Sequence, residues 1–561
     1  MKFSKISRKI GFPCLVIALC FFLMFGIGEK SAFAQTSTDR LFVQNTDRSQ
    51  VRNITDQELA ELGDPFFNLV LKDHPDETNL AEIEQLLQPD STKRETFVVS
   101  ERILDASRPQ NRRAILTFQG SNRNNGNPIF LSPNVMISVP FNSEDFSDNP
   151  EQLEIWGWDE QRGRYNYYRL DRNGNRLSEP RQGTLTWKFR GNSVNADTLS
   201  AANRQGTCLQ CHVNGGPIMK ELFLPWNNWE SFESSQSYLR FEPPIGWPVV
   251  SNIRLKNLKG AEFLESEIIS AIKQFNSQRI DELTSEDSGV IEISDTQRLL
   301  KPLFKTTEFN IISSDTTTRL HPFTSTTEQP TDDYIIPNSF FLNADLIAGS
   351  RLGEQFTGGF RIDSARAFEA KVKPEEYERL VNEAGVKLAD QQPGDANFAW
   401  FVPEPSFIDN NFLDQLITKN IVPREFVAAV LAIDLDNPVL SQERQSLFEL
   451  DIIPSQFQVE PVNNLITQTV AALESLNPAS NSPEGEFLAI LKSEDPVALL
   501  RNKVDEYLER ETSLLNADDN TRFTELTRLY QIAVERRQAV LADEILGDLD
   551  ETNGTLLLPV P

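Results

Sequence analysis

Residues 152–170 read QLEIWGWDEQRGRYNYYRL and carry the clearest strand pattern in the chain. Gln152–Trp158 and Tyr165–Leu170 are rich in aromatic and aliphatic residues, and the polar stretch between them contains Gly163. Two such runs around a short turn are typical of antiparallel strands. The stretch therefore predicts a hairpin and, with it, an antiparallel sheet.

The strand pattern extends outward over residues 114–190. Ile129–Phe141 and Leu185–Phe189 are also rich in β-branched and aromatic residues, and Asn173-Gly174 predicts a second turn. We therefore expect one antiparallel β unit over residues 114–190. Its core is expected to hold three tryptophans, which could alternatively line a pocket: Trp156, Trp158 and Trp187.

Helical patterns lie on both sides of this unit. Apolar residues recur at helical spacing around Leu59–Leu71 and Leu80–Leu87, which predicts a helical N-terminal segment over residues 35–113. Residues 411–561 are expected to form a largely helical C-terminal region. The fold class that follows is α+β.

Three features support the helical C-terminal region. Pro423 suits the first turn of a helix, and two longer amphipathic stretches follow at Val497–Leu515 and Arg522–Leu546. Asp434–Asn437 is acidic but lacks the glycine and the final glutamate of a calcium loop, so we expect a helix end there.

Residues 207–212, in the central region 191–410, read TCLQCH. The thiols of Cys208 and Cys211 lie on one side of a single helical turn, which suits thioether bonds to the two vinyl groups of one haem. His212 is then placed to bind the haem iron. The chain has three histidines in 561 residues, so a histidine at this position is rarely a coincidence.

Two other interpretations of the cysteine pair exist. A thiol–disulfide oxidoreductase also uses two cysteines at this spacing, but it has no evident use for His212. A zinc site usually needs four protein ligands, and Cys208, Cys211 and His212 supply three. Haem attachment explains all three residues, and the redox dithiol is the main alternative.

With this motif the chain resembles the c-type cytochromes. The resemblance covers Cys208, Cys211 and His212 and extends at most to Trp229, a small part of the chain. It implies one covalently bound haem c, His212 as the proximal iron ligand and a role in electron transfer. It does not imply the fold of the remainder. We expect loops and short helices over residues 191–250 and a mixed pattern from there to residue 410, and we expect this haem-bearing central region, residues 191–410, to contact the other parts.

The second iron ligand has several candidates. Met219 has suitable chemistry, but the seven residues from His212 reach at most about 24 Å when extended, so a path around the haem edge is taut. His321 is the second candidate, and an open iron position is the third. Met136 lies in an apolar strand and is expected in the core, whereas His74 is expected to be exposed.

Two tryptophans follow the motif. Trp226 and Trp229 could pack on the haem macrocycle, and a local core is the alternative. The glycines at 215 and 216 would let the backbone approach a flat cofactor closely. No Gly-rich phosphate loop and no G-x-S-x-G motif occurs in the chain, so the sequence leaves open whether the haem is catalytic.

Residues 1–34 have the pattern of a signal peptide. A basic start precedes an apolar run, and Ala32-Phe33-Ala34 matches a cleavage site, with an uncleaved anchor as the alternative. Cleavage after Ala34 would export the protein to the periplasm or beyond, and Cys14 and Cys20 would leave with the leader. No later stretch has the apolar length of a membrane span.

The net charge of −28 becomes about −32 without the leader. Such a charge disfavours nucleic acid and anionic membranes as partners and favours a basic, exported redox partner, although solubility alone could explain it. The sequence therefore predicts an exported monohaem cytochrome in electron transfer. The alternative is a haem-dependent enzyme or small-ligand sensor with an open distal iron site.

Overall fold

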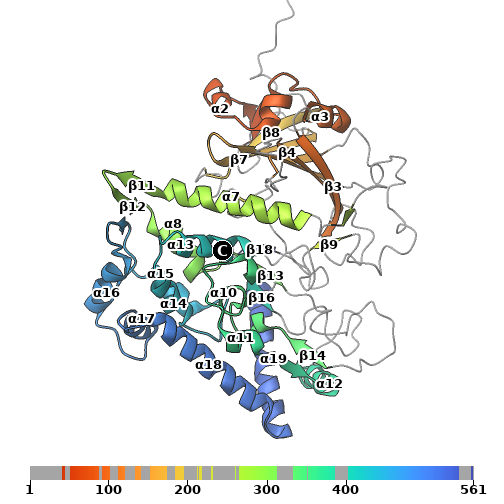
Figure 1. Cartoon of the computed structure of the whole chain (residues 1–561). Helices are drawn as coiled ribbons and strands as arrows, with labels where there is room; N and C mark the ends of the chain where they lie inside the picture. The colour runs from red at the N-terminus through yellow and green to blue at the C-terminus, as the bar shows by residue number, and fades with distance from the viewer. Residues whose placement is uncertain are drawn as a thin grey trace, which may run out of the picture.

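A computed structural model describes residues 41–44, 51–87, 91–100, 112–120, 133–140, 152–172, 184–194, 212, 214–217, 229–231, 259–260, 264–311, 333–349, 352–385, 402–541 and 557–559. Figure 1 shows a sheet with short helices at one end of the protein and a mainly helical part at the other. The long helix α7 (Glu265–Leu283) crosses between them (Figure 1).

One ten-stranded sheet forms the first part, in the order β10-β3-β4-β5-β6-β7-β8-β1-β2, with β9 also paired to β3. Neighbouring strands are antiparallel, except for the parallel pairs β1 with β8 and β10 with β3. The strands are β1 (Leu41–Gln44), β2 (Val51–Asn53), β3 (Ser91–Ser100), β4 (Arg112–Gly120), β5 (Val135–Pro140), β6 (Leu153–Asp159), β7 (Arg164–Arg172), β8 (Leu185–Asn192), β9 (Trp229–Ser231) and β10 (Lys259–Gly260).

The hairpin predicted from residues 152–170 is confirmed. Strands β6 and β7 pair antiparallel, with Leu153 opposite Leu170 and Trp158 opposite Tyr165. Gly163 in the turn has φ +62°, a left-handed conformation that glycine adopts without steric cost. The predicted turn at residues 173–174 lies outside the described residues.

The expectation of a helical segment over residues 35–113 was incomplete. Helical spacing did identify α2 (Asp56–Ala60), η2 (Phe67–Leu71) and α3 (Leu80–Leu87). The same segment also supplies β1, β2 and β3 to the sheet. β1 is a short strand whose partner β8 lies far along the chain, so its pairing leaves no local pattern in the sequence.

The sheet is buried on both faces because successive side chains of a strand point to opposite sides. One face packs against α2, η2 and α3, and it carries Val135, Ile137, Leu153, Ile155, Tyr168, Leu170 and Trp187. The other face packs against the core that includes α7, and it carries Met136, Trp156, Trp158, Tyr165 and Tyr167. We call these the outer face and the inner face. The three tryptophans expected in the core are buried, but on different faces.

A buried carboxylate ties the N-terminal helices to the outer face. Asp64 accepts hydrogen bonds from the Tyr168 hydroxyl at 2.5 Å, from Asn166 Nδ2 at 2.8 Å and from the Phe67 amide at 3.0 Å. Burial raises the pKa of Asp64, and these three hydrogen bonds oppose that shift.

Residues 264–559 form the mainly helical part, and the chain as a whole is an α+β protein. Its helices after α7 are α8 (Thr296–Phe304), η8 (Asn338–Phe340), α10 (Ala344–Ile347), η9 (Gly353–Gln355), α11 (Asp363–Ala367), α12 (Pro374–Glu383), α13 (Phe407–Thr418), α14 (Arg424–Leu431), α15 (Gln442–Glu449), α16 (Leu465–Leu476), α17 (Pro483–Leu491), α18 (Pro496–Leu515) and α19 (Asp519–Leu541).

Short strands complete this part. They form the sheets β11-β12-β17, β16-β13-β18 and β14-β15. Their bounds are β11 (Thr284–Asp287), β12 (Val290–Ile293), β13 (Glu308–Ile311), β14 (Tyr334–Ile336), β15 (Ala370–Val372), β16 (Pro403–Pro405), β17 (Phe457–Glu460) and β18 (Leu557–Pro559).

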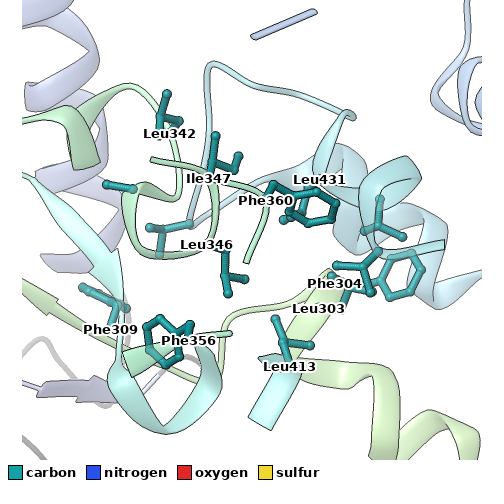
Figure 2. Packing of buried hydrophobic residues seen from close by; sticks show 14 of the residues in the cluster. Leu303, Phe304, Phe309, Leu342, Leu346, Ile347, Phe356, Phe360, Leu413 and Leu431 are labelled. Carbon is teal, nitrogen blue, oxygen red and sulfur yellow. The ribbon is translucent and has the colours of Figure 1, made fainter. Parts of the chain in front are cut away.

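A continuous hydrophobic core fills the helical part. Figure 2 shows side chains from separate segments converging in it, including Phe304 from α8, Leu346 from α10 and Leu413 from α13. Phe304 makes edge-on ring contacts with Phe426 and Phe487, with centroids 6.2 Å apart in each pair. Contacts between segments far apart in the sequence therefore hold this part together.

The predicted C-terminal helices are confirmed. The stretch Val497–Leu515 corresponds to α18. The stretch that begins at Arg522 corresponds to α19, which is described as far as Leu541. Pro423 lies one residue before α14, as its N-cap. Asp434 follows that helix with φ +52° and accepts hydrogen bonds from Asn437 and Ser441, so this acidic stretch ends a helix as expected.

Within the described ranges, no helix combines the length and the apolar character that crossing a bilayer requires.

Two buried carboxyl groups lie close to each other in the helical core. Asp345 of α10 accepts a hydrogen bond from Asn410 Nδ2 at 3.2 Å, and Glu404 of β16 accepts one from the Ser339 hydroxyl at 2.6 Å. Burial raises the pKa of Asp345 to about 7. Burial and the charge of Asp345 together raise the pKa of Glu404 well above its ordinary value.

These groups predict a stability that falls with rising pH. The folded protein holds a proton on Asp345 that the unfolded chain releases near its ordinary pKa of 3.8, so stability declines from there to about pH 7, and the ionisation of Glu404 extends the decline. Asp345→Asn should flatten the decline in urea unfolding at pH 5 and pH 8. The exposed Asp363→Asn should not, and equal pH dependence in both variants would contradict the prediction.

Candidate functional site

Part of the TCLQCH motif and the loop after it are described. His212 and residues 214–217 lie within the described residues, whereas Cys208, Cys211, Met219, Trp226 and His321 lie outside them. Trp229 begins β9, where its backbone pairs with Ser100 of β3. Met136 is buried in the core and His74 is exposed, in agreement with the sequence interpretation.

His212 is held by its own loop and by the inner face of the sheet. Its Nδ1 lies 3.0 Å from the carbonyl oxygen of Gly216, and its ring lies edge-on against Trp156, with centroids 3.6 Å apart. A carbonyl oxygen can only accept a hydrogen bond, so Nδ1 carries the proton. In the neutral ring, Nε2 then has the lone pair that can bind a metal.

The two glycines after His212 let the loop lie close to the surrounding wall. Gly215 has φ +77°, its amide donates to the His212 carbonyl at 2.8 Å, and its own carbonyl accepts a hydrogen bond from the Tyr167 hydroxyl. A Cβ atom at Gly216 would lie 2.5 Å from Phe275 of α7 and 3.1 Å from Ile408 of α13. Any larger residue at Gly216 would therefore push the loop away from both helices.

A chain of polar contacts anchors the other side of the loop. Asn214 Nδ2 donates to the Thr307 hydroxyl at 2.7 Å and to Glu308 Oε1 at 3.2 Å. The Thr307 hydroxyl in turn donates to Asp409 Oδ1 at 2.6 Å. Asp409 Oδ2 accepts from the amides of Thr307 at 2.7 Å and Glu308 at 3.2 Å. The loop is therefore fixed to both β13 and α13.

A buried arginine lies beside this anchor. Arg279 of α7 donates to Asn276 Oδ1 at 3.3 Å, and its guanidinium lies 4.4 Å from the ring centroid of Phe412. Burial lowers the pKa of Arg279 to about 10, and the charge of Asp409 opposes the shift. Burial also raises the pKa of Asp409, against the hydrogen bonds of Thr307 and Glu308 and the charge of Arg279. The two opposite charges partly compensate each other.

The loop thus lies where three parts of the protein meet: the inner face of the sheet, α7, and the β13–α13 region. The anchoring residues Tyr167, Thr307 and Asp409 did not emerge from the sequence. They lie 45 to 197 residues from His212 and belong to no local motif. A deeply buried polar residue can be expected to have a partner, but the sequence alone does not say which one.

Outside the motif, the described stretches offer no group of three or more His, Cys, Asp or Glu side chains that could hold a metal ion. Comparison of the chain with protein-family models, with curated proteins and with solved structures gives no match.

Two neighbouring tyrosines of the inner face provide a matched test of this geometry. The buried hydroxyl of Tyr165 has no hydrogen-bond partner within the described parts of the chain, whereas that of Tyr167 donates to Gly215. Tyr165→Phe should therefore raise the free energy of unfolding by about 1 kcal/mol, and Tyr167→Phe should lower it by about 1 kcal/mol. Urea unfolding measures both changes. If Tyr165→Phe destabilised the protein as much as Tyr167→Phe, the two hydroxyl groups would not differ in hydrogen bonding as the structure indicates.

Proposed function

We propose that this chain is an exported c-type cytochrome that acts in electron transfer. One haem c is attached through Cys208 and Cys211, and His212 is its proximal iron ligand. The TCLQCH motif carries the proposal, because it combines the only two cysteines beyond residue 34 with one of three histidines.

The geometry of His212 supports this role. Its Nδ1 is directed at the Gly216 carbonyl, which fixes both the tautomer and the orientation of the ring. An iron ligand needs this arrangement, because a hydrogen bond at one ring nitrogen leaves the other nitrogen basic and holds it in place. Trp156 restricts the ring further by its edge-on contact.

The loop is surrounded by apolar side chains. Trp156 and Tyr167 come from the sheet, Phe275 from α7 and Ile408 from α13, and all four are buried. A haem needs more apolar surface than a short loop can offer. The apolar side chains at the junction of sheet and helices support the proposal on this side of the loop.

Export and charge complete the proposal. Residues 1–34 act as a signal peptide cleaved after Ala34, and the protein functions in the periplasm or outside the cell. The net charge, −28 for the whole chain and about −32 without the leader, favours an exported redox partner with a basic surface.

Covalent attachment is the first test. Haem should stay with the exported protein after denaturation and acid–organic extraction, and the mass should exceed that of the chain cleaved after Ala34 by one haem. Cys208→Ala together with Cys211→Ala should remove the covalent haem. His212→Ala should chiefly destroy the normal iron ligation, which absorption spectra detect.

The matched control is Cys14→Ala together with Cys20→Ala, which changes cysteines of the leader and should leave haem attachment intact. A colourless protein with two thiols or a disulfide, produced in cells that attach haem, would refute the proposal. The dithiol oxidoreductase would then be the better interpretation.

The distal ligand is the second test. We expect Met219 in this position, so the oxidised protein should show the near-infrared charge-transfer band of methionine bound to ferric haem. Met219→Leu should abolish that band, and Met136→Leu should leave it unchanged because Met136 is buried in the core. A low-spin ferric spectrum that lacks the methionine band in the unaltered protein, and that becomes high-spin in His321→Ala, would assign His321 instead. A high-spin spectrum in the unaltered protein would favour an enzyme or sensor with an open iron site.

A further inference from the structure

A series of aromatic rings in contact leads away from His212 along the inner face of the sheet. The His212 ring lies against Trp156, with centroids 3.6 Å apart, and Trp156 lies 5.8 Å from Tyr165. Tyr165 lies 4.8 Å from Trp158. Trp156, Tyr165 and Trp158 belong to the hairpin of β6 and β7, so the backbone pairing of two adjacent strands fixes the spacing of these three rings.

The series of rings ends just beneath the protein surface. Trp158 is 4% exposed, and its indole N–H donates to Glu160 Oε2 at 2.8 Å. Glu160 is exposed in the turn after β6, where Gln274 Nε2 of α7 also donates to its carboxylate at 3.3 Å. The last ring is therefore one hydrogen bond away from an exposed carboxylate.

Electron transfer through protein occurs by tunnelling, and its rate falls exponentially with the length of the barrier. Covalent bonds and rings in contact give a lower barrier than gaps between side chains. A path through three rings in contact, beginning at the iron ligand, therefore has a lower barrier than a route of equal length across aliphatic packing.

We propose that Trp156, Tyr165 and Trp158 form the electron path between the haem and the surface at Glu160. This inference rests on the proposed haem attachment at His212. In each transfer, one electron passes from the external donor to ferric iron, which becomes ferrous, and the donor is oxidised by one electron. The rings mediate the transfer without being oxidised or reduced themselves.

The chemistry at the end of the path indicates a redox partner with a cationic surface. Glu160 is an exposed carboxylate on a chain of net charge −28, so the field around it attracts a partner whose contact surface is positive. Placed there, the partner's redox group would lie next to Trp158.

The cysteine content of the chain allows a direct test. With Cys208 and Cys211 carrying haem, Gln161→Cys introduces a single reactive thiol in the exposed turn beside Glu160 and leaves the Trp158–Glu160 hydrogen bond intact. A ruthenium polypyridyl label on this thiol donates an electron to ferric haem after a laser flash. The rate of ferric haem reduction is then measured by transient absorption.

Changes in the path should slow this reduction. Trp158→Leu and Tyr165→Leu should each lower the rate several-fold, and Tyr165→Phe, which keeps the ring, should restore most of it. Trp187→Phe is the matched control, because Trp187 is equally buried but packs on the outer face against Phe66. It should leave the rate unchanged.

The outcomes are distinguishable. Suppose that all variants show full haem absorbance and that ferric haem is reduced at the same rate in Trp158→Leu, Tyr165→Leu and Trp187→Phe. This result would overturn the path and leave the cytochrome proposal intact. A protein without covalent haem would overturn both. Reduction of each variant by dithionite, a small diffusing reductant, should be equally fast, which shows that any slow intramolecular reduction does not come from a damaged haem site.

Discussion

The ten-stranded sheet carries apolar side chains on both faces, and each face has to be covered by another part of the chain. The short N-terminal helices cover the outer face, and α7 covers the inner face (Figure 1). Because α7 also packs against α13, it joins the sheet to the helical part. The corner between sheet, α7 and α13 is a consequence of this two-sided burial, and the His212 loop lies in it.

The loop stays in this corner through interactions of two kinds. Its glycines allow close apolar contact with Phe275 and Ile408, and Asn214 joins the polar chain that ends at Asp409. Asp409 accepts three hydrogen bonds, and a hydrogen bond to a charged group contributes about 1.5–3 kcal/mol. Those bonds offset the cost of burying the carboxylate, with Arg279 contributing the opposite charge.

Sequence patterns predicted the elements whose cause is local. The hairpin around Gly163 follows from two aromatic and aliphatic runs around a turn residue, and helix α18 follows from amphipathic spacing. The parallel pairing of β1 with β8 could not be predicted, because it depends on contacts between segments almost 150 residues apart. The same holds for the anchoring of Asn214 by Thr307. His212 stood out through its chemistry, whereas its surroundings are a product of the whole fold.

The burial of the motif's C-terminal side bears on the choice between haem and dithiol chemistry. A catalytic dithiol exchanges electrons by direct attack on a partner's disulfide, so its segment has to be accessible. Here Gly215, Gly216 and Pro217 are buried, and His212 is half-buried against Trp156. A haem can exchange electrons from a buried position, since tunnelling needs no contact between iron and partner. The burial of the loop after His212 is therefore compatible with the proposed haem chemistry.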